Sequence, residues 1–289
     1  MELTKFVALS SATLAVAATW VAGSGAGKAP KPLLLETEKQ YKSIPFREGE
    51  QLRFEINWKP LFLLPAFKAG ELSLRVDKTR YHRNESYTIS AQTLSEGMLK
   101  EVAGQDIRDY FESTIDGRSF RSYRFLHRKR QNERKRDLEV EMDYSGNRTL
   151  IREVDLASQP PQELRNESVS GLPAAVVDTL SVFYVARLRA MEPGDEYLMH
   201  LSDEGKIKDV VIRVEEAEEI KIALGRYETI KISTKGGIFK GGGNFRIWYT
   251  RDERRLPVKF EADVQFGKVY GQLTQLETPR LTKGLIRLK

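Results

Sequence analysis

The chain has 289 residues, and its 40% hydrophobic and 30% charged content can bury a core, which excludes a wholly disordered protein. Lys and Arg number 47 against 41 Asp and Glu, and the resulting net charge of +6 is too small to demand a nucleic-acid partner. The absence of cysteine excludes disulfide bonds, cysteine-ligated zinc, iron–sulfur clusters and thiol nucleophiles, and three histidines argue against a multi-histidine metal site.

The N-terminal segment has the layout of a secretory signal. Lys5 precedes an uncharged stretch at residues 6–23, and small residues follow it up to Ala26. This pattern predicts that residues 1–26 are a signal peptide and that the exported chain starts near Gly27. A retained, uncleaved membrane anchor is the alternative, because the uncharged stretch is near the lower length limit for crossing a bilayer. Either way the body of the protein lies outside the cytoplasm, periplasmic or secreted.

The body of the chain has the pattern of a mainly β protein. Residues 27–45 are polar and contain three prolines, which predicts a linker. From residue 46 onward, apolar and polar residues alternate with the period of half-buried strands. This alternation occurs at residues 52–58, 72–76, 87–91, 138–142, 210–214, 220–222, 230–232, 245–249, 258–262 and 269–276. Roughly a dozen strands with short turns predict a single antiparallel meander, strongly curved or barrel-like, over residues 46–280. A basic tail follows at 281–289.

One segment, Pro173–Met191, departs from the alternation and predicts the main helix. Pro173 suits a first helical turn, and Gly194 stands just after the end. Apolar residues recur at helical spacing at Val177, Leu180, Tyr184 and Leu188. We expect this helix to pack on the curved sheet and to plug its open side or one end. The polar segment before it, Asp155–Gly171, is predicted to be a loop.

Several short sequence motifs, taken in their order along the chain, resemble those of one known family. They are Gly49–Phe54 with Trp58, Ala69–Leu72, Asp178–Ser181 with Tyr184 and Arg187, Trp248–Asp252, and Leu256–Val258. Together they resemble the exported bacterial proteins grouped as domain of unknown function 3108, over about residues 46–277. The resemblance implies a bacterial envelope location and a β-rich fold. It brings no known reaction and no catalytic residues.

Four polar residues of the predicted helix form the candidate ligand site. Asp178, Ser181, Tyr184 and Arg187 recur at a spacing of three, so one helix face carries a carboxylate, a hydroxyl, a phenol and a guanidinium. The alternative, which we favour, is structural: an Asp178–Arg187 network and a buried Tyr184 hydroxyl tie the helix to the sheet. Ser181 has no histidine nearby in sequence and no Gly-x-Ser-x-Gly motif around it, so no catalytic residue is assigned.

A dense run of cations marks a second candidate site, for polyanions. It comprises Arg128, Lys129, Arg130, Arg134, Lys135 and Arg136. In an exported protein, an anionic membrane surface or an acidic polymer is the accessible partner, and no nucleic acid is expected. The alternative is a solvated strand edge whose cations prevent sheet-to-sheet aggregation. The glycine-rich segment 235–243 is interpreted as a flexible hairpin rather than a ligand loop.

These features predict a non-enzymatic envelope protein that binds a lipid or other amphiphile or docks to an envelope protein. A cysteine-free exported chain also fits a bacterial envelope, where disulfides are less general than in eukaryotic secretion. A hydrolase acting on an envelope polymer and a purely structural factor are the alternatives. No cofactor or metal is expected. An apolar cavity would favour binding, converging acids in an open cleft would favour a hydrolase, and a filled interior would favour a structural role.

Overall fold

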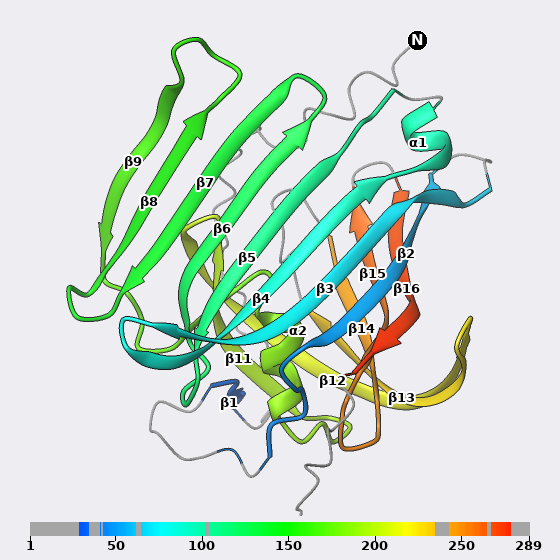
Figure 1. Ribbon diagram of the computed structural model, residues 1–289. Helices are drawn as coiled ribbons and strands as arrows, with labels where there is room; N and C mark the ends of the chain where they lie inside the picture. Colours follow the sequence, from blue (N-terminus) through cyan, green and yellow to red (C-terminus); the bar gives the residue numbers. More distant parts are fainter. Residues whose placement is uncertain are drawn as a thin grey trace, which may run out of the picture.

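The computed structural model describes residues 29–34, 41, 43–61, 65–101, 104–234, 243–264 and 267–278. These residues form one large β-sheet with two short helices (Figure 1). The predicted signal peptide, all but the last residue of the glycine-rich segment and the predicted basic tail lie outside the described residues. None of the described helices is long and apolar enough to span a membrane.

The first half of the chain is an antiparallel meander. Its strands are β2 (Glu50–Pro60), β3 (Phe67–Tyr81), β4 (Asn84–Ser95), β5 (Arg108–Asp116), β6 (Ser122–Gln131), β7 (Arg134–Asp143), β8 (Arg148–Asp155) and β9 (Gln162–Ser170). The five-residue helix α1 (Gly97–Glu101) interrupts it between β4 and β5. Each strand pairs with the next, so the alternating apolar residues of neighbouring strands share one face.

The second half is another antiparallel meander, reached by a buried crossover. The crossover contains β10 (Val176–Asp178), helix α2 (Val182–Val185) and a turn of 3-10 helix (Ala186–Leu188). The strands that follow are β11 (Glu196–Asp203), β12 (Lys206–Ile222), β13 (Gly225–Thr234), β14 (Phe245–Thr250), β15 (Pro257–Val264) and β16 (Gly267–Glu277). The alternating segments predicted at 210–214 and 220–222 are two parts of the long strand β12.

The two meanders are joined in the middle of the sheet, because the last strand, β16, pairs antiparallel with β2. The short strands β1 (Lys31–Pro32) and β10 run parallel to β11. The expected curved, mainly β architecture is confirmed, but the expected single antiparallel meander is wrong in two details. The crossover divides it, and β1 and β10 add parallel pairs to it. The sheet is not closed: β9 ends the pairing order on one side, and β1 and β10, which both pair with β11, end it on the other.

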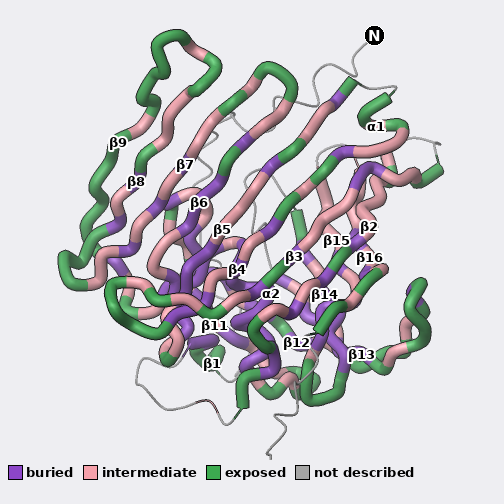
Figure 2. The backbone as a smooth tube through the Cα atoms, viewed as in Figure 1, coloured by how far each residue is buried: buried purple, intermediate pink, exposed green. Residues whose placement is uncertain are grey.

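The core lies on the inner, concave side of the sheet, around the crossover. Figure 2 shows buried residues gathered where α2 meets β11, β12 and β14, while β9 is largely exposed. The crossover contacts both meanders through hydrogen bonds. The Ser113 hydroxyl of β5 donates to the Asp178 carboxylate, and the Tyr249 hydroxyl of β14 donates to the Phe183 carbonyl. The crossover therefore occupies the space that the curled sheet leaves between its halves.

The predicted main helix at Pro173–Met191 is wrong. Val176 and Val177 are extended and pair with β11, as suits β-branched residues, and only one turn of α-helix and one turn of 3-10 helix follow. The Asp178 side chain accepts hydrogen bonds from the backbone N–H groups of Leu180 and Ser181, a local turn that competes with helix formation. The segment is nonetheless buried as expected, because its apolar residues pack against strands on several sides.

The predicted loop at Asp155–Gly171 is also wrong, since most of it is β9. This strand is exposed along nearly its whole length, and its residues show no alternation of apolar and polar types. It forms because its backbone extends the ladder from β8, from Arg148 paired with Ser170 to Asp155 paired with Gln162. An edge strand that is wet on both faces gives no hydrophobic period for a sequence to reveal.

Candidate functional site: an apolar cavity inside the curved sheet

A cavity of about 610 Å³, partly open to solvent, lies against the concave face of the sheet. Both meanders contribute to its walls. Its apolar lining comprises Ile56, Leu72, Leu74, Ala91, Leu99, Ile107, Phe111, Phe125, Leu180, Phe183, Phe245, Phe260, Ala262, Val264 and Val269. Strand alternation explains the lining, because residues two apart on a strand point to the same face. Leu72 and Leu74 of β3 are one such pair, and Ala91 and Thr93 of β4 are another.

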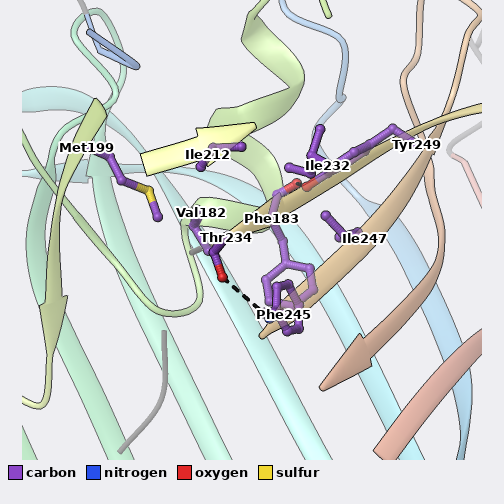
Figure 3. Close-up of a pocket in the computed structure, with 9 residues that line it drawn as sticks. All are labelled: Val182, Phe183, Met199, Ile212, Ile232, Thr234, Phe245, Ile247 and Tyr249. Carbon is purple, nitrogen blue, oxygen red and sulfur yellow. Dashed lines mark hydrogen bonds between the residues drawn. The ribbon is translucent and has the colours of Figure 1, made fainter. Parts of the chain in front are cut away.

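The crossover forms the floor of this cavity. Phe183 extends from α2 to Phe245 of β14, with ring centroids 5.8 Å apart and planes at 76° (Figure 3). Behind these rings lies a second, much smaller space of about 20 Å³, with Met199 and Ile212 among its apolar lining residues. It holds little more than one water-sized sphere and offers almost no polar partner, so it is a packing gap. The large cavity is therefore the candidate ligand site.

One wall of the cavity is polar. The Lys129 Nζ of β6 lies 2.6 Å from Glu204 Oε1, and Lys129 is only 6% exposed. The His127 ring lies between two carboxylates, with Nε2 3.4 Å from Asp109 Oδ2 and Nδ1 3.6 Å from Glu204 Oε1. Gln131 donates to Asp109 at 2.6 Å. We call these five residues the polar wall; all but Asp109 line the cavity.

The carboxylates of the polar wall are held in their charged form. Burial by itself would raise the pKa of Glu204, but hydrogen bonds and charges from His127 and Lys129 outweigh burial and lower this pKa to about 2. The pKa of Asp109 is lowered as well, because hydrogen bonds from His127 and the Arg130 amide overcome the effect of burial. Both groups are therefore ionised at neutral pH and hold their cationic or polar neighbours in place.

A tight turn brings Glu204 to the polar wall. Glu204 and Gly205 connect β11 to β12, with φ angles of 50° and 89°, as in the two-residue turns that join twisted strands. A Cβ atom on Gly205 would lie 2.5 Å from Ile151 Cδ1 of β8, so glycine is required there for close approach as well as for conformation. The tip of the β11–β12 hairpin thus reaches across the interior to the other meander.

The four candidate residues of the crossover lie outside the lining of this cavity. Asp178 and Ser181 belong to one network: Ser181 donates its backbone N–H to Asp178 Oδ1 at 2.8 Å, and the Ser122 hydroxyl donates to Asp178 Oδ2 at 2.6 Å. Arg187 belongs to another, where its Nη1 lies 2.6 Å from Glu50 Oε1. Asp178 and Arg187 are each completely buried and are joined to different strands rather than to one another.

Tyr184 lies beside Arg187, whose guanidinium is 5.3 Å from the centre of its ring. Its hydroxyl has no hydrogen-bond partner within the described part of the chain, and burial raises the pKa of this phenol. The expected buried hydroxyl is therefore present, but it does not tie the segment to the sheet. Leu180 and Phe183, which are next to Ser181 and Tyr184 on the crossover, line the cavity instead.

The six candidate cations of the basic run are placed in different surroundings along β6 and β7. Lys129 belongs to the polar wall, Arg130 Nη2 lies 2.8 Å from Asp137 Oδ1, and Arg136 lies 3.6 Å from Glu153. The Arg128 guanidinium is 5.7 Å from the centre of the Tyr110 ring. Arg134 and Lys135 begin β7 next to the hairpin turn. Several of these charges are thus already compensated, and polyanion binding by the run stays a prediction.

Comparison with known proteins assigns the family. The family model described as "Protein of unknown function (DUF3108)" matches residues 53–274. The chain belongs to the DUF3108 family. The matched region contains every residue that lines the cavity, from Ile56 to Val269. No curated protein matches the sequence.

Several solved structures align with this DUF3108 protein at low sequence identity. A β-barrel-like protein of the family DUF1849 from Brucella abortus aligns with a TM-score of 0.54 and 9% identity, covering 81% of this chain and 98% of that one. A predicted exported protein with a YmcC-like fold from Bacteroides fragilis gives a TM-score of 0.32, with 9% identity and coverages of 81% and 98%. A predicted lipoprotein from Parabacteroides distasonis gives 0.29, with 12% identity and coverages of 86% and 100%.

At 9% identity, the Brucella abortus protein is similar to this chain in fold alone. This similarity supports the barrel-like curvature of the DUF3108 sheet and leaves the ligand open. Among the described residues, no group of His, Asp and Glu side chains is arranged to hold a metal ion.

Most of the polar wall of this DUF3108 protein was not predicted from the sequence. Lys129 was singled out as a surface cation, whereas His127, Asp109 and Glu204 were not considered together. A signal was present, because His127, Lys129 and Gln131 follow Phe125 at a period of two on β6. When polar residues continue the inward-facing positions of a strand, they indicate an interior that contains water or a functional site.

Proposed function

We propose that this protein is a non-enzymatic envelope protein that holds the apolar part of an amphiphilic molecule in its cavity. The observation that supports this proposal is the cavity itself. Protein cores pack with few voids larger than a water molecule, whereas ligand sites commonly have volumes of roughly 300–1,000 Å³. The volume of about 610 Å³ falls in the second class. Its mostly apolar lining suits a hydrocarbon chain, and its polar wall suits a head group.

A purely structural role is less well supported, because a structural factor gains nothing from leaving this face unfilled. Ile56, Leu72 and Phe111 line the cavity and are only partly buried. Apolar surface that stays in contact with water costs about 25 cal/mol per Å² relative to burial. A ligand that covers these side chains recovers that free energy, which provides the driving force for binding.

A hydrolase is supported less well than a binding protein. His127 contacts two carboxylates and stacks on Phe111 with ring centroids 4.0 Å apart. Within the described ranges, no serine or threonine hydroxyl hydrogen-bonds to this ring. A nucleophilic mechanism needs a hydroxyl within reach of its base. The two carboxylates are also engaged by Gln131 and Lys129 rather than standing ready as acid and base.

Replacing Thr93 with tryptophan is expected to weaken ligand binding strongly while preserving the fold. Thr93 lines the cavity from β4, so the larger side chain occupies the space of the ligand. We expect the affinity for the uncharged fluorescent probe N-phenylnaphthylamine to fall by roughly tenfold or more. The neighbouring Gln92 is exposed on the opposite face of β4, and Gln92→Trp is the matched control. Equal probe binding by both variants would show that the ligand lies elsewhere.

Export is the second part of the proposal, and it is supported by the N-terminal sequence. If residues 1–26 are a signal peptide, the form recovered from the bacterial envelope starts near Gly27. N-terminal sequencing of that form tests the expectation directly. A protein that still begins at Met1 and is extracted only with detergent would show that the segment is an anchor. The cavity would face the same compartment in both cases.

A further inference from the structure

Every ionised side chain that the described part of the chain places at the cavity surface already has an oppositely charged partner. Lys129 pairs with Glu204 at 2.6 Å, with His127 beside the same carboxylate. Asp203 lies 3.3 Å from the Lys208 ammonium, and Asp263 lies 3.2 Å from the Arg246 guanidinium. A ligand entering this cavity therefore meets a compensated surface rather than an exposed charge.

The balance of the lining charges disfavours an anion in particular. Among the described residues, the lining carboxylates are Asp203, Glu204 and Asp263, whereas the lining cations are Lys129 and, when protonated, His127. An anionic head group at the polar wall could gain a partner only by taking Lys129 from Glu204. That exchange leaves the Glu204 carboxylate, only partly exposed, without its cation, and losing one partner of a buried pair is costly.

Uncharged polar groups at the same surface can accept a neutral head group without this cost. Thr93, Thr179 and Gln131 line the cavity with two hydroxyls and a carboxamide. Each of these groups contains both a hydrogen-bond donor and an acceptor. An alcohol, ester or amide head group can therefore bind without disturbing an ion pair.

We propose that the cavity selects an amphiphile with an uncharged polar head group and discriminates against carboxylate and phosphate head groups. The proposal rests on the binding function proposed above and adds the chemical class of the ligand. The Lys129–Glu204 pair acts as the selectivity element, because it presents a buried cation that is not available to a ligand anion.

Competition for the N-phenylnaphthylamine site by amphiphiles with one chain and different heads tests this proposal on the full-length protein. The competitors are dodecanol, dodecanoate, dodecyl phosphate and dodecylammonium at neutral pH. We expect dodecanol to compete at roughly tenfold lower concentration than either anion. Dodecylammonium controls for the cost of removing any ion from water, and we expect it to bind more tightly than the anions but more weakly than dodecanol.

Replacing Glu204 with glutamine should reverse the discrimination. The substitution frees Lys129 to pair with a ligand anion, so the affinity for dodecanoate should rise roughly tenfold. The affinity for dodecanol should stay within about threefold, because no ion pair is needed to bind it. Glu167 pairs with Arg165 at 3.1 Å on the exposed strand β9, and Glu167→Gln is the matched control that should change neither affinity.

The possible results test the head-group proposal separately from the binding function on which it rests. Failure of the probe and of all competitors to bind would overturn the binding function and the head-group proposal together. Binding of the probe with dodecanoate or dodecylammonium as the best competitor would overturn the head-group proposal alone. The wild-type ranking decides this even if the Glu204 variant does not fold.

Discussion

Replacing Arg187 with methionine is expected to destabilise the protein by about 3–5 kcal/mol, because it breaks a buried ion pair. The guanidinium is fully buried, and its Nη1 and Nη2 atoms lie 2.6 and 3.2 Å from the two carboxylate oxygens of Glu50. It also donates to the backbone carbonyls of Pro45 and Arg254, at 2.9 and 3.0 Å. Arg187 thus joins the crossover to the start of β2 and to the turn between β14 and β15. Urea denaturation measures the loss.

Two further variants separate the ion pair from other effects. In Arg187→Met/Glu50→Leu the buried carboxylate is removed as well, so we expect the double variant to be more stable than the single one. Arg226 pairs with Glu219 at 2.8 Å, but both side chains are largely exposed, and Arg226→Gln should cost less than about 1 kcal/mol. If Arg187→Met left the urea midpoint unchanged but weakened ligand binding, Arg187 would belong to a ligand site instead.

The alternation of apolar and polar residues predicted strands at ten segments, but β5, β6, β8 and β11 were not among them. Leu52 and Phe54 of β2 and Val140 and Met142 of β7 are buried, while residues between them are more exposed, and both strands were found by alternation. Alternation also fails at the two extremes of burial. β9 is exposed on both faces, and the crossover is buried on nearly all sides, so neither has the expected period.

The crossover shows how tertiary contacts override a local helical pattern. The spacing of Leu180, Tyr184 and Leu188 suits a helix, and all three residues are buried. However, β11 recruits Val176 and Val177 as a parallel strand, and strands from both meanders surround the rest. Helix propensity is a weak preference compared with such packing. The local pattern therefore predicted correctly that the segment is buried but not the shape that it takes.

The candidate ligand site could not be located from the sequence, because it depends on contacts between distant segments. Alternation indicates that Leu72 and Ala91 share the apolar face, but it does not show whether that face is filled or hollow. The cavity arises where β16 pairs with β2 and where the hairpin turn at Glu204 reaches Lys129 of β6. These pairings depend on how the sheet twists and curls, which a periodic pattern does not specify.

Replacing Asp178 with alanine is expected to destabilise the protein by roughly 3–5 kcal/mol, because four donors lose their acceptor in the core. The completely buried carboxylate accepts from the hydroxyls of Ser113 and Ser122 and from the backbone N–H groups of Leu180 and Ser181. It therefore fastens the crossover to β5 and β6 and also shapes the turn before α2. Thermal and urea unfolding both measure the effect.

Comparing Asp178→Asn with Asp178→Ala shows how much of the lost stability comes from the hydrogen bonds of Asp178. Asp178→Asn keeps one oxygen for the two backbone N–H groups, and the serine hydroxyls can rotate to accept from the new amide, so we expect roughly half the loss. Asp209 is exposed and pairs with His200 at 2.7 Å, and Asp209→Ala should change stability by less than about 0.5 kcal/mol. A stable Asp178→Ala protein that no longer binds the probe would contradict the structural role and assign Asp178 to the ligand. Loss of stability with probe affinity retained in the folded fraction would instead show that this carboxylate holds the floor of the cavity in place without touching what binds there.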